Sequence, residues 1–269
     1  MTDSAPDRQS PPGPTGLDAY KPAEIALLVE TAGVAKARLT LTPLVTLACL
    51  AGVFIAFGAM FFLAVLAGAD PAHGPARLAA GAAFSLGLIL VIVGGAELFT
   101  GNALMVLAWV DGRIGTRDVL RNWTIVFLAN LVGALAMVAL AVMAGLDKGA
   151  IGAPAAQIAA AKFKLGAGEL LARGALCNAL VCLAVWLSVS ARDTTGKVMV
   201  IVPPIAAFVA LGFEHSIANM FLLPFGLAAG AAGGFADIAT NLFWVSLGNV
   251  IGGGGGVALS YWAAYRAGR

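Results

Sequence analysis

Two adjacent ionisable residues, Glu214 and His215, lie in the middle of a long apolar stretch of the chain. No residue from Val198 to Phe213 or from Ser216 to Ala236 carries a charge. Placing a carboxylate and an imidazole in apolar surroundings is costly, so such residues mark a functional site by default. An imidazole in this setting can form hydrogen bonds where water cannot, and it can exchange a proton with a small solute.

A second stretch repeats this arrangement earlier in the chain. The segments Gly95–Asn102 and Gly212–Asn219 carry Gly, Glu and Asn at the same relative positions. The segment that follows each of them also matches, since Asn130–Gly133 and Asn249–Gly252 both begin with Asn and end with Gly. We interpret these matches as an internal repeat.

The composition identifies the class of protein that holds the two stretches. The chain has 269 residues, of which 60% are hydrophobic and 11% are charged, whereas roughly a quarter of the residues in a soluble domain are charged. This composition indicates an integral membrane protein. A net charge of +2 gives no support for a nucleic-acid partner. The three cysteines lie in apolar segments and are expected to be packing residues, and the sequence predicts no metal site, no cofactor and no enzyme activity.

The uncharged runs predict six passes through the lipid bilayer, the second and fifth of which are broken. The chain is therefore expected to consist of three segments: a disordered tail over residues 1–20, an interfacial amphipathic helix over 21–40, and a six-helix transmembrane domain over 41–269. The expected passes are Pro43–Ala69, Leu78–Val110 with a break at Glu97, Asn122–Leu146, Gly174–Ala191 with a start as early as Gly166, Val198–Gly233 with a break at Glu214, and Ile238–Tyr265.

The interfacial helix is expected to begin near Pro22 and to end at Lys36 and Arg38 on the membrane surface. Asp18 is the expected N-cap residue. We expect one apolar face on this helix, made by Ile25, Leu28, Val29 and Ala32.

Six passes place both termini on one side of the membrane. Most of the 16 Lys and Arg residues lie in the termini and in the loops that share that side. The positive-inside rule therefore predicts that both termini are cytoplasmic, which in a bacterium means the cell inner membrane.

The repeat itself points to a transport site. An odd number of passes separates the two halves, so they have opposite orientations, and inverted repeats with paired broken helices indicate a site near the middle of the membrane. Half-helix N-termini that face such a site favour an anion. We expect Glu97 and Glu214 to cap the second half-helices by accepting backbone N–H bonds, because a carboxylate would repel an anionic substrate.

Both loops resemble the signature loops of the formate/nitrite transporter family. The matching segments are Glu97–Asn102 (ELFTGN) and Gly212–Phe221 (GFEHSIANMF). Three further segments resemble the family as well, namely Phe84–Leu88, Leu176–Cys182 and Gly248–Gly253. The resemblance implies an all-α membrane protein whose protomer has an aquaporin-like fold of two inverted three-helix repeats, and which assembles as a homopentamer with one pore in each protomer.

The resemblance also implies roles for individual residues. Thr100 and His215 match the central pair that contacts the permeating anion. Leu88 and Leu98 match the residues of one pore constriction, and Phe84 and Phe208 match those of the other. Phe99 lies in the same broken loop as Leu98.

Further matches concern the mouth of the pore and the support of the loops. Lys162 matches a basic residue near the outer vestibule, although Lys164 is close enough in sequence for either lysine to fill this place. The residues that match loop-supporting positions are Asn178 and Asn249, together with Glu97, Asn102, Glu214 and Asn219.

These features predict transport of small monovalent anions of weak acids, most of all formate. Because a neutral imidazole is expected at position 215 and the constrictions are apolar, we expect the species that crosses to be effectively neutral, so that transport is coupled to a proton. Nitrite and hydrosulfide are alternative substrates. A channel for water or another neutral solute is a second class of function, but the breaks carry Thr-Gly-Asn and Ser-Ile-Ala-Asn rather than paired Asn-Pro-Ala turns.

Overall fold

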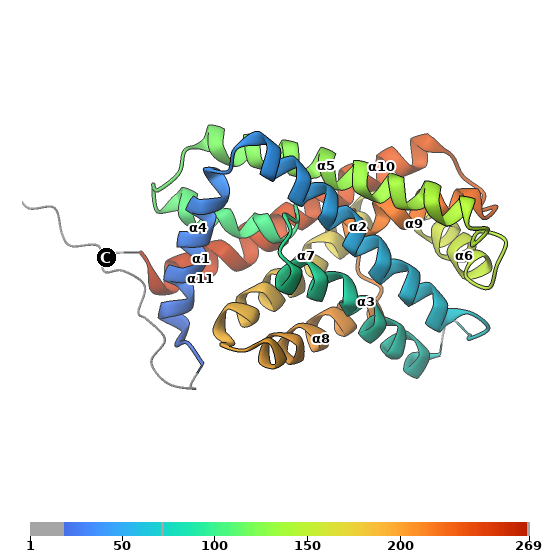
Figure 1. The fold of residues 1–269 in the computed structure, drawn as a ribbon, viewed down its shortest axis with the longest axis horizontal. Coiled ribbons are helices and arrows are strands. Elements are labelled where there is room, and N and C mark those ends of the chain that lie inside the picture. Colours follow the sequence, from blue (N-terminus) through green and yellow to red (C-terminus); the bar gives the residue numbers. More distant parts are fainter. Residues whose placement is uncertain (1–18, 71–72, 268–269) are drawn as a thin grey trace, which may run out of the picture.

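A computed structural model describes residues 19–70 and 73–267, and every regular element among them is helical (Figure 1). The expected disordered tail therefore lies almost entirely outside the described residues, as does Asp18. The first helix begins at Pro22 with Lys21 as its N-cap residue, so the expected cap was wrong. The elements are α1 (Pro22–Ala37), α2 (Leu41–Leu66), α3 (Gly74–Gly94), the short 3-10 helix η1 (Gly101–Leu104), α4 (Met105–Val110), α5 (Thr116–Met143), α6 (Gly152–Phe163), α7 (Ala167–Ser190), α8 (Thr194–Ala210), α9 (Ser216–Ala228), α10 (Phe235–Val250), the π-helical segment η2 (Ile251–Ala258) and α11 (Leu259–Tyr265).

Five helical stretches in the described residues are long and apolar enough to cross a membrane. They are α2, α3, α5, α7 and the continuous stretch from α10 through η2 to α11. The helices α8 and α9 are shorter and apolar, and five non-helical or turn residues separate them where Glu214 and His215 lie. The chain also leaves the helical conformation between α3 and η1, so both expected breaks are present. The protein is an all-helical membrane protein.

The helix α6 is absent from the sequence-based expectation, which left residues 147–165 as a connection. This helix is only 12 residues long and consists mostly of Gly, Ala and other small residues, so it gives neither the length nor the polarity pattern by which a helix is recognised. It packs against α9 at the end of the bundle opposite to α1 (Figure 1).

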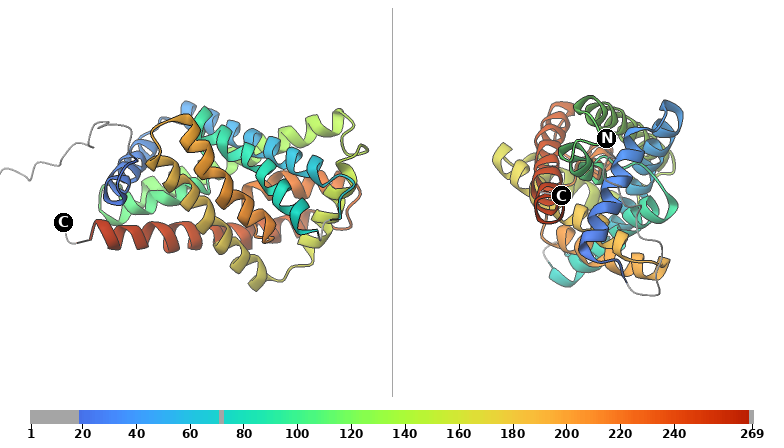
Figure 2. Two further views of the ribbon diagram at one scale, coloured as in Figure 1. Left: turned by 90° about the horizontal axis from the view of Figure 1, so that it is seen from below. Right: turned by 90° about the vertical axis from the view of Figure 1, so that its left-hand side faces the viewer.

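The helix α1 is present over nearly the expected residues, and its buried face contains Ile25 and Val29 of the expected face but not Leu28 and Ala32. Its buried residues include Ile25, Val29, Gly33 and Val34, whereas Ala32 is exposed. The reason is that α1 packs on α4, α7 and α11, across the end of the bundle where the C-terminus lies (Figure 2). Protein rather than lipid therefore covers much of this helix.

A cluster of charges fixes α1 to the C-terminal end of the chain. The carboxylate of Glu30 is fully buried, and its two oxygen atoms lie 2.8 Å from Arg113 Nη1 and 2.7 Å from Arg266 Nε. Arg266 also pairs with Asp111, which accepts a hydrogen bond from the Trp262 indole. Burial raises the pKa of Glu30 above its usual value, against the opposing effect of the two arginines. The cluster joins three segments that are far apart in the sequence.

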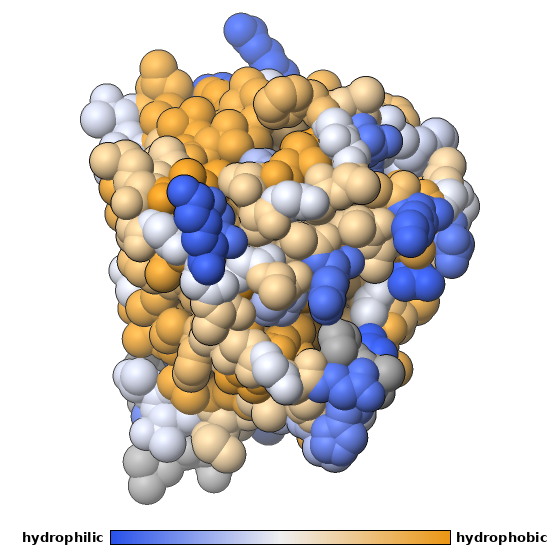
Figure 3. All heavy atoms as spheres, turned by 90° about the vertical axis from the view of Figure 1, so that its right-hand side faces the viewer, coloured by the Kyte–Doolittle hydropathy of each residue, from blue (hydrophilic) through white to orange (hydrophobic). Residues whose placement is uncertain are grey.

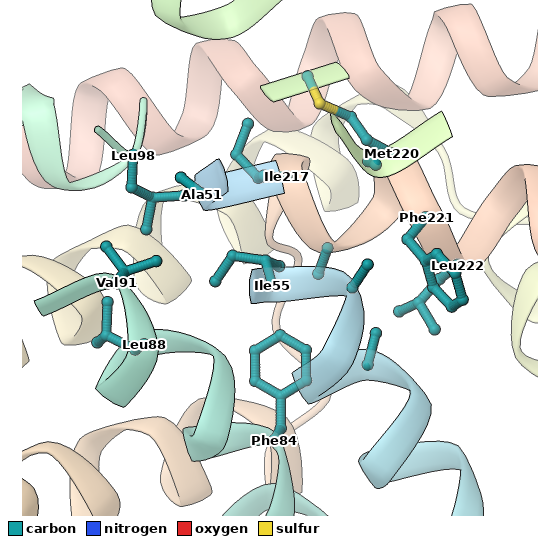
Figure 4. Packing of buried hydrophobic residues seen from close by; sticks show 14 of the residues in the cluster. Ala51, Ile55, Phe84, Leu88, Val91, Leu98, Ile217, Met220, Phe221 and Leu222 are labelled. Atoms are coloured by element: carbon teal, nitrogen blue, oxygen red, sulfur yellow. The ribbon is translucent and has the colours of Figure 1, made fainter. Parts of the chain in front are cut away.

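Small residues allow the helices to approach closely around the bundle axis. A side chain at Gly133 would overlap the carbonyl of Cys49 in α2, and one at Gly252 would overlap the carbonyl of Ala175 in α7. Larger side chains fill the space between helices elsewhere, as where the ring of Phe84 on α3 points toward Ile55 on α2 (Figure 4). Close backbone contact of this kind is how helices associate within a membrane.

We predict that Gly252→Ala strongly destabilises the protein, because the added methyl group overlaps backbone rather than a movable side chain. Overpacking costs typically about 1–3 kcal/mol, and backbone is less able to yield than a side chain. The temperature at which detergent-purified protein loses its monodisperse gel-filtration peak measures this effect. Gly255→Ala is the matched control, since nothing lies within 4 Å of a Cβ atom at that position. Equal loss temperatures for the two variants would contradict the packing described here.

We further predict that Glu30→Gln loosens α1 from the bundle. Removing a buried carboxylate that pairs with two arginines costs more than about 1.4 kcal/mol, which corresponds to at least tenfold faster amide exchange in a segment that opens locally. Hydrogen–deuterium exchange of peptides from α1 measures the change. Glu24→Gln in the first turn of the same helix is the control, because that carboxylate lies in an exposed contact with the Lys21 backbone. Unchanged exchange in Glu30→Gln would show that the cluster does not hold α1.

Candidate functional site

The structure brings Thr100 and His215 together from the two helix breaks. Thr100 precedes η1 and His215 precedes α9, and 3.0 Å separates Thr100 Oγ1 from His215 Nε2. Both side chains are buried, with relative exposures of 1% and 3%. The two residues that the sequence predicts as the central pair therefore meet in space.

The hydrogen bonds of His215 define the role of each ring nitrogen. Its Nδ1 accepts a hydrogen bond from the backbone N–H of Ala218 at 3.0 Å, so His215 is the N-cap residue of α9. In a neutral imidazole one nitrogen accepts and the other donates, so Nε2 carries the hydrogen atom and donates it to Thr100 Oγ1. The Thr100 hydroxyl can then donate its own hydrogen to an anion.

Glu214 does not cap α9, contrary to the expectation from the sequence. One of its carboxylate oxygens lies 2.7 Å from Lys162 Nζ, and the other accepts a hydrogen bond from Asn219 Nδ2 at 2.7 Å. Asn219 Nδ2 also donates to Asn241 in α10. The carboxylate is free to bind side chains because His215 already caps the helix.

The other break contains the same set of side chains. Glu97 pairs with Lys36 and accepts a hydrogen bond from Asn102 Nδ2 at 2.7 Å. Asn102 Nδ2 also donates to Asn122 in α5 at 2.8 Å. Within residues 19–70 and 73–267, the Glu97 carboxylate likewise forms no hydrogen bond to the backbone of the following helix, so the capping expectation is wrong for both glutamates.

An asparagine from the facing helix supports each broken loop. Asn249 Oδ1 accepts a hydrogen bond from the backbone N–H of Ser216, while its Nδ2 donates to the carbonyl of Glu214. Asn130 does the same at the other break, with Phe99 N–H as donor and the carbonyl of Glu97 as acceptor. These side chains replace the hydrogen bonds that an unbroken helix would have made.

Asn178 supports the loop at Thr100 directly. Its Nδ2 donates to the carbonyl oxygen of Thr100 at 3.1 Å and to that of Asn249 at 2.7 Å. The Thr100 backbone is therefore held in place independently of its hydroxyl group, which stays available for the contact with His215.

Two cavities reach toward the Thr100–His215 pair from opposite ends. We call the first the α6 cavity; it has a volume of about 310 Å³, and its lining includes Lys162, Phe84, Phe208 and His215. The rings of Phe84 and Phe208 lie edge to face with centroids 5.7 Å apart, and their assignment to a constriction stays a prediction. Lys164 is exposed at the end of α6 and does not line this cavity, so the geometry favours Lys162 at the mouth.

The second cavity, which we call the α1 cavity, has a volume of about 550 Å³ and is lined by Lys36, Glu97, Leu88 and Leu98, among others. The two leucines therefore border this cavity, and their assignment to a constriction stays a prediction. Phe99 lines neither cavity, because its ring packs edge to face on Trp123 and Phe127 of α5. Its assignment to a constriction stays a prediction.

Sequence reasoning assigned no role in the site to four residues of the two loop networks, namely Lys36, Asn122, Asn130 and Asn241. Of these, Asn130 was already matched to Asn249 in the internal repeat. The sequence offset between Asn130 and Asn249 is the same as that between Asn122 and Asn241. Extending the repeat through all of the asparagines and lysines would have found them.

Comparisons with known proteins agree with this geometry. The family model described as "Formate/nitrite transporter" matches residues 23–263. The chain is 44% identical over 217 residues to the formate channel FocA of Escherichia coli K12, covering 78% of this chain and 75% of that protein. The chain belongs to the formate/nitrite transporter family. It is therefore a transporter or channel and not an enzyme.

Other relatives extend the match to an archaeon and to solved structures. A "Probable formate transporter" of Methanothermobacter thermautotrophicus is 38% identical over 236 residues, covering 79% of this chain and 85% of that protein. A structure named "FNT family ion channel" has a TM-score of 0.84 at 31% identity and covers 90% of this chain and 98% of its own. A structure named "Pentameric formate channel with formate bound" has a TM-score of 0.76 at 37% identity. The match covers 88% of this chain and 98% of that chain.

For this member of the formate/nitrite transporter family, we predict that Lys36→Met is destabilising and that a second change, Glu97→Gln, relieves the effect. The single change leaves the Glu97 carboxylate buried without its cation. The cost is about 1–3 kcal/mol, less than for a fully buried pair because 30% of the Lys36 side chain is exposed. Thermal unfolding of the purified protein measures both steps. The lysine-to-methionine variant must unfold at a lower temperature than both the wild type and the double variant; any other order would refute the pairing.

Proposed function

We propose that this protein carries formate and related small monovalent anions of weak acids across the membrane, together with a proton. The observation that carries this proposal is the buried Thr100–His215 pair, which lies where an apolar constriction borders a cavity on either side. The pair supplies hydrogen bonds at the point where an anion has lost its water. Formate is the favoured substrate because the names of several relatives specify it.

The proposed protomer has six membrane passes arranged as two inverted repeats. The matched networks around Glu97 and Glu214 support this topology, since each uses a lysine, two asparagines and a further loop-supporting asparagine in the same way. We further propose that α1 and α6 are counterparts, because each ends near the lysine that pairs with its glutamate. The repeat unit then contains a short helix ahead of its three passes.

We propose a homopentamer in the lipid bilayer of the cell inner membrane, with both termini and the α1 cavity on the cytoplasmic side. The positive-inside distribution supports this orientation. Large apolar side chains such as Phe57, Phe61, Leu128 and Val132 are exposed on the single chain, as expected of helices that face lipid or neighbouring protomers. The α6 cavity then opens to the outside.

A neutral solute crosses the Phe and Leu constrictions more readily than an ion does. In the proposed mechanism Lys162 attracts the anion into the α6 cavity, and the Thr100 hydroxyl donates a hydrogen bond to it beyond the first constriction. A proton either arrives with the weak acid, or His215 first gains a second proton from water at Nδ1 and then passes one to the anion from Nε2, which returns the imidazole to its neutral form. Between such transfers the Nδ1 lone pair accepts the Ala218 N–H, so the neutral form of His215 suits both the helix cap and the passing substrate.

Transport into liposomes tests the proposal. Wild-type protein is expected to admit formate faster at external pH 5 than at pH 7, bracketing the ordinary pKa of about 6.5 for histidine, and to acidify the interior as it does so. Two variants separate the roles of His215. His215→Ala removes the helix cap and the imidazole, whereas His215→Asn keeps a good cap residue without a ring that can carry a proton.

We expect His215→Asn to stay folded and to lose most of the pH dependence. A formate flux that leaves internal pH unchanged and ignores external pH would refute proton coupling. Faster entry of nitrite than of formate would change the substrate within the family. Entry of water or glycerol but of neither anion would overturn the proposed function.

A further inference from the structure

The α6 cavity contains two arginines that the mechanism above does not use. Arg77 from the start of α3 and Arg173 from α7 line this cavity together with Lys162. Among its lining residues the cavity has one carboxylate, that of Glu214, and both oxygens of this group are already bound by Lys162 and Asn219. The cavity therefore has positive charge that its own carboxylate does not neutralise.

Both arginines approach the same point beside the second helix break. A Cβ atom at Gly212 would lie 3.1 Å from Arg77 Nη2 and 3.9 Å from Arg173 Nη1. Arg173 Nη1 also donates to the carbonyl of Gly212 at 3.4 Å, and Arg173 Nη2 reaches the exposed carboxylate of Glu169 at 3.3 Å. Within residues 19–70 and 73–267, the Arg77 guanidinium has no hydrogen bond or ion pair. Two guanidinium groups that face one point repel each other unless an anion lies between them.

The arginine on α7 is a departure from the internal repeat. The backbone N–H of Glu214 donates to the carbonyl of Arg173, and the backbone N–H of Glu97 donates to the carbonyl of Leu47 in the same way. Leu47 is thus the counterpart of Arg173, and it lines the α1 cavity. Lys36 is the one cation among the lining residues of that cavity. The extra positive charge therefore lies at only one end of the proposed transport path, in the α6 cavity. Figure 3 shows this end of the molecule, where hydrophilic side chains lie among apolar ones.

We propose that Arg77 and Arg173 form a binding site for a planar anion with two oxygen atoms in the α6 cavity, ahead of the Phe84–Phe208 constriction. A guanidinium group binds two oxygen atoms of a carboxylate through parallel N–H bonds, whereas a lysine acts as a point charge. The site therefore selects carboxylates or nitrite over anions with a single binding atom, such as hydrosulfide or chloride. Its position on the transport path rests on the proposed function.

A site at one mouth makes the two directions of transport unequal in affinity. An anion that enters through the α6 cavity meets the arginine pair before it loses water at the constriction, while one that enters through the α1 cavity meets Lys36 and Leu47. Formate entry from the α6 side is therefore saturable at lower concentration than entry from the α1 side, although an anion crosses the same two constrictions, in opposite order, in either direction.

Chemical labelling tests the site without reference to transport. Phenylglyoxal modifies arginine side chains, and the modified residues can be identified by mass spectrometry in the full detergent-purified protein. We expect sodium formate to slow labelling of Arg77 and Arg173 several-fold relative to sodium chloride at equal ionic strength, and to leave the exposed Arg117 unaffected. Equal protection by chloride would overturn the proposal, because it would show a general effect of charge.

Flux measurements test the position of the site on the path. The double variant Arg77→Lys with Arg173→Lys keeps both charges and removes both planar donor groups, and Arg173→Leu places the residue of the other half at this position. In right-side-out membrane vesicles we expect the lysine variant to raise KM for formate several-fold and to leave KM for hydrosulfide unchanged, with little change for either anion in inverted vesicles. An unchanged KM for formate in both variants would overturn the proposal.

The two proposals fail in different ways. If the wild type carries formate, but formate does not protect the arginines from labelling and the arginine variants do not change KM, the transport function stands and the arginine site is wrong. If formate protects the arginines while the wild type carries no formate, the site stands and the transport function is wrong.

Discussion

Broken helices inside an apolar bundle leave backbone N–H and C=O groups that must find partners, and the whole site depends on how this protein supplies them. Asn130 and Asn249 each use both ends of one amide group for this purpose. An unsatisfied buried group costs about 1–3 kcal/mol, so two asparagines stabilise both breaks at once. The loops that carry Thr100 and His215 can then be rigid without being helical.

Charge at the breaks is arranged so that carboxylates lie near the anion path but do not face it uncompensated. Each glutamate is bound by a lysine and an asparagine. The short helices α1 and α6 bring these lysines to opposite ends of the molecule (Figure 1). His215 combines two functions in one ring, since one nitrogen caps α9 and the other meets Thr100. The neutral form of the imidazole is thereby part of the fold as well as of the site.

The sequence was sufficient to predict the two breaks and the long apolar helices, because ionisable residues in apolar runs and matched spacing are local signals. The pairing of Thr100 with His215 followed only from the resemblance to the family. It was not sufficient for α6, whose small residues produce no polarity pattern, or for the pairing of Lys36 with Glu97, which are 61 positions apart. The expected capping by glutamate was wrong because the histidine beside Glu214 already occupies that place. The buried face of α1 depends on contacts with α4 and α11 that no periodicity within α1 reveals.

The order of residues along the chain has a consequence for biosynthesis. A ribosome releases Lys36 before Glu97 and Lys162 before Glu214, so in each half the cation leaves the ribosome ahead of the carboxylate that it will neutralise. Chains generally fold from the N-terminus during synthesis. Each half can therefore complete its own ion pair as it enters the lipid, and neither carboxylate has to wait in the membrane for a partner that has yet to be translated.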